Sequence, residues 1–242
     1  DKDKQMNGQN ESLVEIKDVR KWFAVQGGTL ERLLAGQTDF VRAVDGVSFT
    51  IKRGEVFGLA GESGSGKTTI GRLALRLEEP TDGDVFFDGI NLAELSSSEL
   101  RKLRRRMQVI FQDPMASLNP RMSVGEAIQH PLQIHFPEHA RQHRQMAMDM
   151  LSRVGLTPPE NFIDKFPHQL SGGQRQRAVI ARALVTQPDL VLADEPIAMA
   201  DVSVRAQLLD LMNHLKDEFN LTFLFITHDL ATAKYICDRI GI

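Results

Sequence analysis

The 242-residue chain contains a single cysteine, Cys237. One cysteine excludes an intrachain disulfide framework and a zinc site built from several cysteines, and it is typical of a protein from a reducing compartment. We expect Cys237 to be a buried structural thiol.

Long hydrophobic runs are also missing from the sequence. No stretch approaches the roughly 18–20 apolar residues that span a bilayer. The polar segment 1–12 lacks the apolar region of a signal peptide, so we expect it to be a flexible N-terminal tail. A role at a membrane would therefore have to come through a partner protein.

The sequence has no excess of positive charge. Its 29 Lys and Arg residues and 32 Asp and Glu residues give a net charge of −3, so the chain as a whole has no electrostatic attraction to nucleic acid or acidic lipid. The basic run RKLRRR at 101–106 is the local exception, and we interpret it as a solvated helix face flanked by Glu94 and Glu99. We expect no nucleic-acid partner.

Short apolar runs rich in β-branched and aromatic residues predict strands at 13–19, 43–51, 55–60, 84–89, 107–112, 190–194 and 221–227. The last three show little polar alternation, which indicates strands covered on both faces in a parallel sheet.

Helical spacing appears at 124–135, 138–154, 173–187 and 203–219, the last with Ser203 as its N-cap. Because 113–185 contains helices almost exclusively, we expect it to be a helical subdomain inserted into an α/β core formed by 13–112 and 186–242. The weakly patterned stretch 25–40 resembles a loop insertion between two early strands.

The sequence GESGSGKT at 61–68 follows a predicted strand and precedes a helical pattern, which is the required context of a phosphate-binding P-loop. Its glycines let the backbone wrap closely around phosphate oxygens, the Lys67 ammonium reaches the β- and γ-phosphates, and the Thr68 hydroxyl ligates Mg²⁺. The expected nucleotide-binding residues are Gly61, Ser63, Gly64, Ser65, Gly66, Lys67, Thr68 and Thr69.

Four polar side chains follow predicted strands of the same sheet. Asp194 and Glu195 end the strand in LVLADEP, at the edge where open α/β sheets bind ligands. Asp194 suits Mg²⁺, and Glu195 is placed to polarise an attacking water. Gln112 can ligate Mg²⁺ or water, and His228 can hydrogen-bond the γ-phosphate. Each alone is explained as well by a structural residue at a strand end; their combination with the P-loop favours function.

The motifs GESGSGKT, Gln112, LSGGQ at 170–174, LADEP, Asp201 and THD at 227–229, in this order, resemble the ABC ATPase family from about residue 13 onward. The resemblance implies a P-loop NTPase core with a parallel-rich sheet, an antiparallel β subdomain and an inserted helical subdomain. It also implies that two ATPase domains pack head to tail, so that each LSGGQ loop closes over ATP held by the other domain's P-loop.

The same resemblance implies an ATP hydrolase that uses ATP and Mg²⁺, and it assigns roles to residues of this chain. Phe23 matches the aromatic residue that stacks on adenine; the adjacent Trp22 is a second candidate, and a core aromatic is the alternative for either. The catalytic residues would be Glu195, His228 and Gln112, the metal ligands Thr68, Gln112 and Asp194, and the residues facing a nucleotide across the dimer Ser171, Gly172, Gly173, Gln174 and Asp201.

Three longer stretches, FQDPMASLNPRMSVGEAI, PHQLSGGQRQRAVIARAL and DVSVRAQLLDLM, are similar to the ATP-binding subunits of bacterial and archaeal oligopeptide/dipeptide importers. This similarity implies a second ATPase subunit, identical or paralogous, two transmembrane permease subunits and an extracytoplasmic solute-binding protein, at the cytoplasmic face of a prokaryotic cell membrane. Import of nickel or a sugar oligomer, and a soluble ABC ATPase machine, are the alternatives.

The sequence departs from these subunits in two places. The run EPIAMAD at 195–201 has Ala198 and Ala200 where the subunits have serine and leucine, in a loop that contacts the partner across the dimer. The family also continues past DRIGI with another strand and a C-terminal extension, which we expect this chain to lack.

Overall fold

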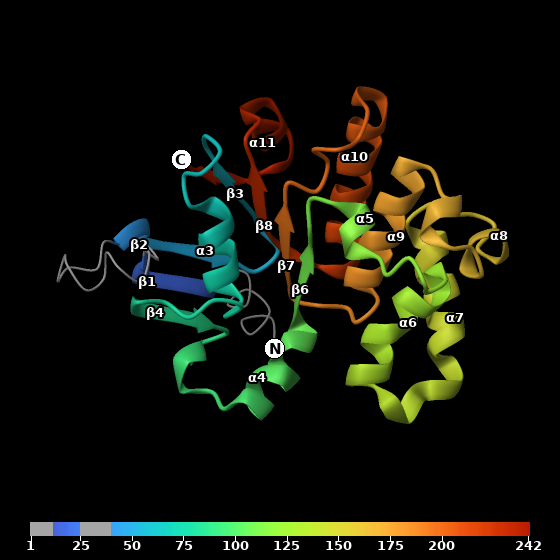
Figure 1. Cartoon of the computed structure of the whole chain (residues 1–242), viewed down its shortest axis with the longest axis horizontal. Helices are drawn as coiled ribbons and strands as arrows, with labels where there is room; N and C mark the ends of the chain where they lie inside the picture. Colours follow the sequence, from blue (N-terminus) through green and yellow to red (C-terminus); the bar gives the residue numbers. More distant parts are fainter. Residues whose placement is uncertain (1–11, 25–39) are drawn as a thin grey trace, which may run out of the picture.

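The computed structural model describes residues 12–24 and 40–242, which fold around two β-sheets (Figure 1). Almost all of the expected N-terminal tail (1–12) and of the expected loop insertion (25–40) lies outside the described residues. The last residue of each stretch, Ser12 and Phe40, begins a strand.

The first sheet is parallel throughout, with the strand order β6-β7-β8-β3-β9. Its members are β6 (Met107–Ile110), β7 (Leu190–Asp194), β8 (Thr222–Thr227), β3 (Val56–Ala60) and β9 (Arg239–Gly241). Successive residues of β8 are buried in different cores, Phe223 in one and Leu224 in the other. Both faces of the sheet are therefore covered, as the uninterrupted apolar runs predicted.

The second sheet is antiparallel, with the order β2-β1-β4-β5. It consists of β1 (Ser12–Ala24), β2 (Phe40–Lys52), β4 (Asp82–Phe87) and β5 (Ile90–Asn91). Helix α3 (Lys67–Ala74) packs between the two sheets. At Gly71 the helix approaches the parallel sheet so closely that a Cβ atom would lie 2.7 Å from Leu192 Cδ1. This layered α/β architecture is the one predicted.

Residues 113–185, all of which the structure describes, contain helices and no strand, as predicted. The α-helices are α5 (Pro114–Ser117), α6 (Val124–His135), α7 (His143–Arg153), α8 (Glu160–Ile163) and α9 (Gly172–Leu184), and the 3-10 turns are η3 (Pro137–Gln142) and η4 (Pro167–Gln169). The prediction of one helix over 138–154 was wrong at its start, because residues 137–142 form a 3-10 segment that is kinked at His139, and α7 begins only at His143.

Two helices follow the last long strands of the parallel sheet, α10 (Val202–Phe219) and α11 (Leu230–Ile236). The expected cap of α10 was wrong: Asp201 occupies the N-cap position with extended backbone angles, and Ser203 lies inside the first turn. Both residue types are good N-caps, so the sequence offered two candidate starts. In the described ranges 12–24 and 40–242, no helix is long and apolar enough to cross a membrane.

The segment between the sheets contains η1 (Leu92–Glu94), α4 (Ser97–Leu103) and η2 (Arg104–Arg106). It ends in an ion-pair cluster in which Asp88, in the β4–β5 turn, binds Arg53 and Arg106, while Arg106 also binds Asp189. The interpretation of 101–106 as a solvated face was therefore wrong for Arg106, because two acids distant in sequence neutralise it and link the two sheets.

The sulfur of Cys237 lies against β3, where a Cβ atom on Gly58 would be only 2.6 Å from Sγ. The residue is partly buried rather than fully buried. Burial raises the pKa of its thiol to about 12. The thiol is therefore protonated at neutral pH and unreactive, consistent with the structural role expected for it.

Candidate functional site

The P-loop at 61–68 joins β3 to α3 at the carboxyl edge of the parallel sheet (Figure 1). Gly66, the N-cap of α3, has a φ of 92°, a conformation that favours glycine. A Cβ atom there would lie 2.2 Å from the carbonyl oxygen of Ala43 in β2, so any larger residue would displace the loop. Ser63, Gly64 and Ser65 are exposed along the loop, and Thr69 is partly exposed on α3.

The Lys67 side chain turns back over the P-loop and is only 9% exposed. Its Nζ atom donates hydrogen bonds to the carbonyl oxygens of Gly61 (2.9 Å) and Glu62 (2.5 Å) and to Oγ of Ser65 (3.1 Å). The ammonium group therefore donates to three loop oxygens. It lies at the N-terminus of α3, where the helix dipole favours an anion.

Thr68 and Asp194 bring together two oxygen atoms of the kind that ligate hard metal ions. The Thr68 hydroxyl donates to Asp194 Oδ1 at 3.1 Å, which links α3 to the end of β7. Burial raises the pKa of the Asp194 carboxyl, the Thr68 hydrogen bond opposes that effect, and the negative charge of Glu195 adds to it. A bound cation would favour the ionised carboxylate, so the pair is suited to a metal ion.

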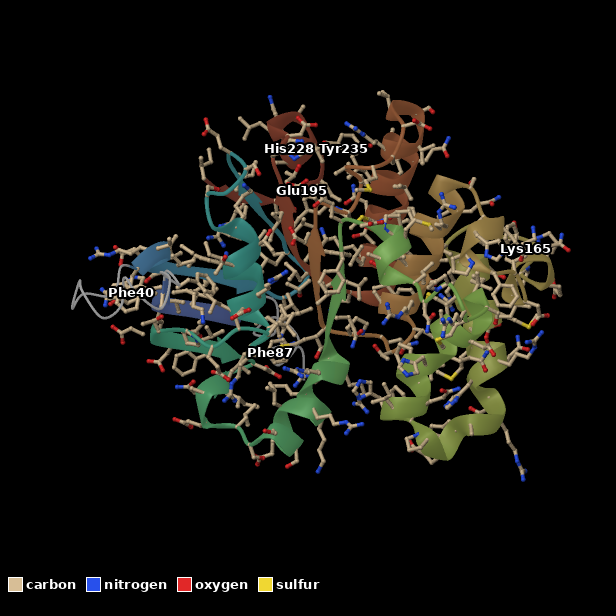
Figure 2. All side chains as sticks on the ribbon, viewed as in Figure 1. Phe40, Phe87, Lys165, Glu195, His228 and Tyr235 are labelled. Atoms are coloured by element: carbon tan, nitrogen blue, oxygen red, sulfur yellow. The ribbon has the colours of Figure 1, made fainter. Side chains whose placement is uncertain are left out.

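Glu195 is the centre of a cluster formed by the ends of three strands. Its backbone leaves β7 with a φ of 48°, and its N–H donates to the Ile226 carbonyl oxygen of β8. Its carboxylate oxygen Oε2 accepts a hydrogen bond from Gln112 Nε2 at 3.2 Å and lies 3.2 Å from His228 Nδ1. Figure 2 shows Glu195 and His228 close together at the upper edge of the sheet. The structure thus brings together three residues that the sequence placed at strand ends.

The LSGGQ segment forms the start of α9. Ser171 is its N-cap: Oγ accepts from the Gln174 N–H at 3.2 Å, and Gln174 Oε1 accepts from the Ser171 N–H at 3.0 Å. A Cβ atom on Gly173 would lie 3.0 Å from Val204 Cγ1 of α10, whereas one on Gly172 would meet no described atom within 4 Å. Packing explains a small residue at 173, but nothing in the described part of the chain requires one at 172.

This segment lies apart from the P-loop of its own chain. Helix α9 packs on β6, α5, α6, α7 and α10, whereas α3 packs on β7, β8 and the antiparallel sheet. In Figure 1 the strands β6, β7 and β8 lie between the two helices. Within one chain, the structure does not assemble the LSGGQ segment with the P-loop.

A short loop connects Glu195 to Asp201, the exposed N-cap of α10. Two turn hydrogen bonds shape it, from Ala198 N–H to the Glu195 carbonyl and from Ala200 N–H to the Ile197 carbonyl, each 3.1 Å. Sequence reasoning missed Arg205 of α10, which donates to carbonyl oxygens of this loop. Arg205 lies within the stretch DVSVRAQLLDLM quoted above, but nothing in that pattern distinguishes an arginine that binds loop carbonyls from one on a solvated helix face.

Phe23 and Trp22, the two candidates for stacking on adenine, lie in β1 of the antiparallel sheet. The Phe23 ring is 41% exposed, with Lys21 Nζ 5.0 Å from its centroid. The Trp22 ring is covered by the Arg42 guanidinium at 4.9 Å, and its indole N–H is buried without a hydrogen-bond partner among the described residues. The exposed ring of Phe23 is therefore the better placed of the two to stack on a planar base.

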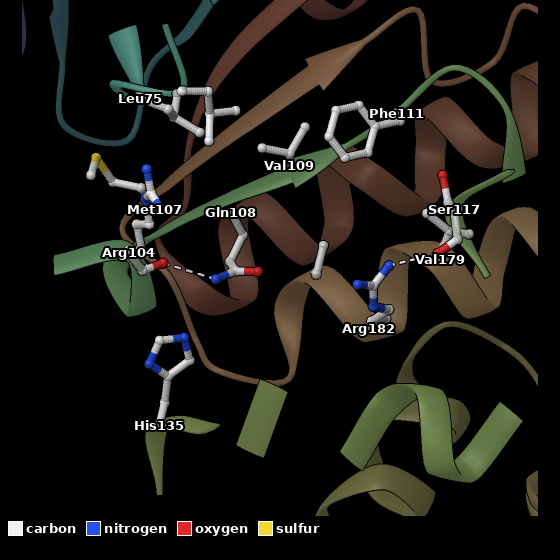
Figure 3. Close-up of a pocket in the computed structure, with 12 residues that line it drawn as sticks. Leu75, Arg104, Met107, Gln108, Val109, Phe111, Ser117, His135, Val179 and Arg182 are labelled. Carbon is white, nitrogen blue, oxygen red and sulfur yellow. Dashed lines mark hydrogen bonds between the residues drawn. The ribbon is translucent and has the colours of Figure 1, made fainter. Parts of the chain in front are cut away.

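A groove of about 300 Å³ runs between β6 and the helices of 113–185 (Figure 3). Leu77, Val109 and Phe111 form apolar walls, and Arg104 and Arg182 contribute positive charge. Arg182 donates to the Ser117 carbonyl at 2.7 Å, and burial lowers the pKa of its guanidinium. No acidic residue is among the described residues that line the groove.

Comparison with known proteins gives consistent results. The model of the ABC transporter family matches residues 44–198. The chain is 46% identical to the oligopeptide transport ATP-binding protein AppF of Bacillus subtilis and 43% identical to the dipeptide transport ATP-binding protein DppF of Haemophilus influenzae, in each case over 96% of this chain and 69% of the relative.

Solved structures agree with the sequence relatives. The dimeric bacterial ABC transporter cassette MJ0796 is 32% identical, with a TM-score of 0.79 over 94% of this chain and 92% of that one. A post-hydrolysis dimer of the same cassette, bound to ADP and Pi, matches with the same values.

Proposed function

Because the chain belongs to the ABC transporter family, we propose that it hydrolyses ATP to power the import of oligopeptides or dipeptides across a cell membrane. AppF and DppF are oligopeptide and dipeptide transport ATP-binding proteins, and each is similar to this chain over 96% of its length. This similarity favours peptides over nickel or a sugar oligomer, and an importer over a soluble ATPase machine. The chain spans about two thirds of the length of these relatives.

The position of Glu195 is the observation that supports hydrolysis most strongly. A general base must reach the proton that it abstracts within hydrogen-bond distance. Hydrogen-bond contacts of 3.2 Å to Gln112 and His228 hold the Glu195 carboxylate at the same sheet edge as the P-loop. We assign it the polarisation of the water that attacks the γ-phosphate. His228 Nε2 can donate to that phosphate in the imidazolium form, in which Nδ1 also carries a proton toward the Glu195 carboxylate.

The P-loop supplies the binding site for the triphosphate. We propose that β- and γ-phosphate oxygens replace Gly61, Glu62 and Ser65 as acceptors of the Lys67 ammonium. An ammonium–phosphate contact is charge-assisted and therefore stronger than the ammonium–carbonyl contacts that it replaces. The exposed Phe23 ring is assigned to adenine.

The residues present fit Mg²⁺. The described part of the chain has no group of three or more His, Cys, Asp or Glu side chains that could hold a metal ion by themselves, but Mg²⁺ does not need such a group. Mg²⁺ commonly binds one or two protein oxygens together with substrate phosphates. We assign Thr68, Asp194 and Gln112 as its protein ligands. The ion would neutralise charge on the phosphate oxygens, and the protein's part is to orient the nucleotide.

The partners follow from the same architecture. We propose that two ATPase chains, identical or paralogous, pack head to tail. The ATP of one chain then faces Ser171, Gly172, Gly173 and Gln174 of the other, and Asp201 lies at the contact between the two chains. The dimeric cassette MJ0796 supports such pairing. The open space beside Gly172 is also consistent with a group supplied from outside the chain.

The remaining partners would be two permease subunits and, through them, an extracytoplasmic solute-binding protein, with this chain at the cytoplasmic face. The apolar groove beside Phe111 is a suitable place for a permease segment, because Phe111 directly precedes Gln112 of the catalytic cluster. A segment bound there could influence the hydrogen bond between Gln112 and Glu195.

The substitution Glu195→Gln tests the catalytic proposal. It keeps the shape of the side chain but removes the base, so we expect single-turnover hydrolysis to fall roughly 10²–10⁴-fold while equilibrium binding of Mg-ATP persists. The matched control is Glu94→Gln, on an exposed carboxylate of η1. Near-normal hydrolysis by Glu195→Gln would remove Glu195 from the role.

Uptake into proteoliposomes tests the solute. The chain would be purified with its co-expressed permeases and binding protein, and labelled dipeptide, tripeptide and Ni²⁺ compared. We expect ATP-dependent peptide uptake. Uptake of Ni²⁺ alone would reject the peptide assignment without affecting the ATPase.

A further inference from the structure

We propose that Arg205 is a positioning residue for hydrolysis, which holds the loop 195–201 and thereby aims the Glu195 carboxylate. The inference rests on the proposed role of Glu195. Arg205 lies in the second turn of α10 and is partly buried. It belongs to none of the motifs that identify the P-loop or the LSGGQ segment.

The guanidinium of Arg205 joins two carbonyl groups of the loop. Its Nε atom donates to the Ala200 carbonyl oxygen at 2.8 Å, and its Nη2 atom lies 3.4 Å from the Ala198 carbonyl oxygen. Hydrogen bonds from a charged donor are stronger than neutral ones. A planar guanidinium also fixes the relative orientation of the groups that it binds. The Arg205 guanidinium therefore holds both ends of the Ala198–Ala200 turn in a fixed relative position.

Burial of Pro196 and Ile197 anchors the start of the loop, so Arg205 acts on the part that follows. At 198 and 200 the side chains are methyl groups, so neither can donate or accept a hydrogen bond, and the turn bonds of Ala198 and Ala200 use their N–H groups rather than their carbonyls. Arg205 therefore binds the backbone at two positions whose side chains cannot form hydrogen bonds.

Glu195 needs such a restraint. Its φ of 48° is a conformation that residues other than glycine seldom adopt, so the surrounding structure must maintain it. The Glu195 N–H is held by Ile226 on the sheet side, and its carbonyl accepts from Ala198 on the loop side. Arg205 holds Ala198, and the chain of contacts from α10 to the catalytic carboxylate is therefore continuous.

A small cavity of about 30 Å³ places Arg205 beside the catalytic cluster. Glu195, His228, Ala198 and Arg205 all line it. Release of the Arg205 contacts would let the loop move into or away from this space, which would change the direction of the carboxylate. Misplacement of a reacting group by about 1 Å can cost as much as 10²-fold in rate.

The test compares Arg205→Met with Arg205→Lys in the purified ATPase and its co-expressed partner subunits. Methionine keeps much of the apolar stem but no donor, and we expect kcat to fall roughly tenfold, within the range that misplacement can cause, with KM for ATP little changed. Lysine can reach one carbonyl and should recover part of kcat.

The matched control is Arg76→Met. Arg76 also donates to two backbone carbonyls, those of Leu92 and Leu95, but it lies away from the loop 195–201. We expect Arg76→Met to lower thermal stability while kcat is retained. A structural role for Arg205 would give the same result, and it would overturn the inference. So would an Arg205→Met variant in which KM rises while kcat stays at the wild-type value.

The Glu195→Gln variant separates the two proposals. If it hydrolyses ATP normally, the assignment of Glu195 fails and the role of Arg205 fails with it. If Glu195→Gln is inactive but folded Arg205→Met has wild-type kcat, the positioning inference alone is wrong.

Discussion

The substitution Asp88→Asn should destabilise the fold by disconnecting its two sheets. Asp88 accepts charged hydrogen bonds from Arg53 and from Arg106, the latter at 2.6 Å between Nη2 and Oδ2. A hydrogen bond to a charged group contributes about 1.5–3 kcal/mol. Because the Asp88 side chain is 32% exposed, solvent screens these contacts, and asparagine can still accept one bond. We therefore expect a loss of about 1.5 kcal/mol.

The same group predicts a pH dependence. The hydrogen bond from Arg106, with the charges of both arginines, lowers the pKa of the Asp88 carboxyl against the opposing effect of burial. A lowered pKa in the folded state means that the stabilisation is present above the pKa of the unfolded chain and is lost as pH falls below about 4. The difference in stability between the wild type and Asp88→Asn should therefore be largest near pH 7 and shrink toward pH 3.

Thermal and urea unfolding at several pH values provide the assay. For a chain of this size, about 1.5 kcal/mol corresponds to a fall of about 3–6 °C in Tm. The matched control is Asp164→Asn, whose bidentate pair with Arg144 is exposed (71% and 55%), so its Tm should equal that of the wild type. Equal Tm values for the two variants at pH 7, or a difference that persists at pH 3, would refute the reasoning.

Two further substitutions test the nucleotide site. Lys67→Ala removes the charged P-loop donor and should weaken Mg-ATP binding roughly 10–100-fold in equilibrium titration, whereas the exposed Lys52→Ala should not; equal affinities would exclude Lys67 from phosphate binding. Ser171→Arg should leave the nucleotide affinity of the isolated chain unchanged but abolish hydrolysis by the dimer, while in the isolated chain Ser171→Ala loses only the helix cap, about 1 kcal/mol. A large loss of affinity in isolated Ser171→Arg would mean that LSGGQ contacts its own chain's nucleotide.

Local patterns predicted the fold where an element was long enough to display its period. The buried strands β7 and β8 and the helix α10 were visible as apolar runs and as helical spacing. Strands β5 and β9 have two and three residues and α5 has four, too few for any period to appear. The cap of α10 was misplaced because Asp201 and Ser203 are both suitable, and only the backbone conformation distinguishes them.

The candidate site was predictable where its geometry follows from parallel strands. Gln112, Glu195 and His228 end strands of one sheet, and the carboxyl ends of parallel strands necessarily share an edge. Arg205 and Arg106 were not predictable in the same way. Their partners are backbone carbonyls or acids far along the chain, and neither kind of partner leaves a motif around the arginine.

The Lys67 side chain, which turns back over the P-loop, has a consequence for turnover. Its ammonium already has three acceptors within the loop, so in the proposed binding mode nucleotide entry would exchange these acceptors for phosphate oxygens. Part of the favourable free energy of each phosphate contact would be offset by the loss of the loop hydrogen bond that it displaces. In the same proposed mode the loop oxygens would accept the ammonium again as phosphate departs, which would lower the barrier to product release. The same three bonds that would limit affinity for ATP would therefore help the subunit to return to its starting state.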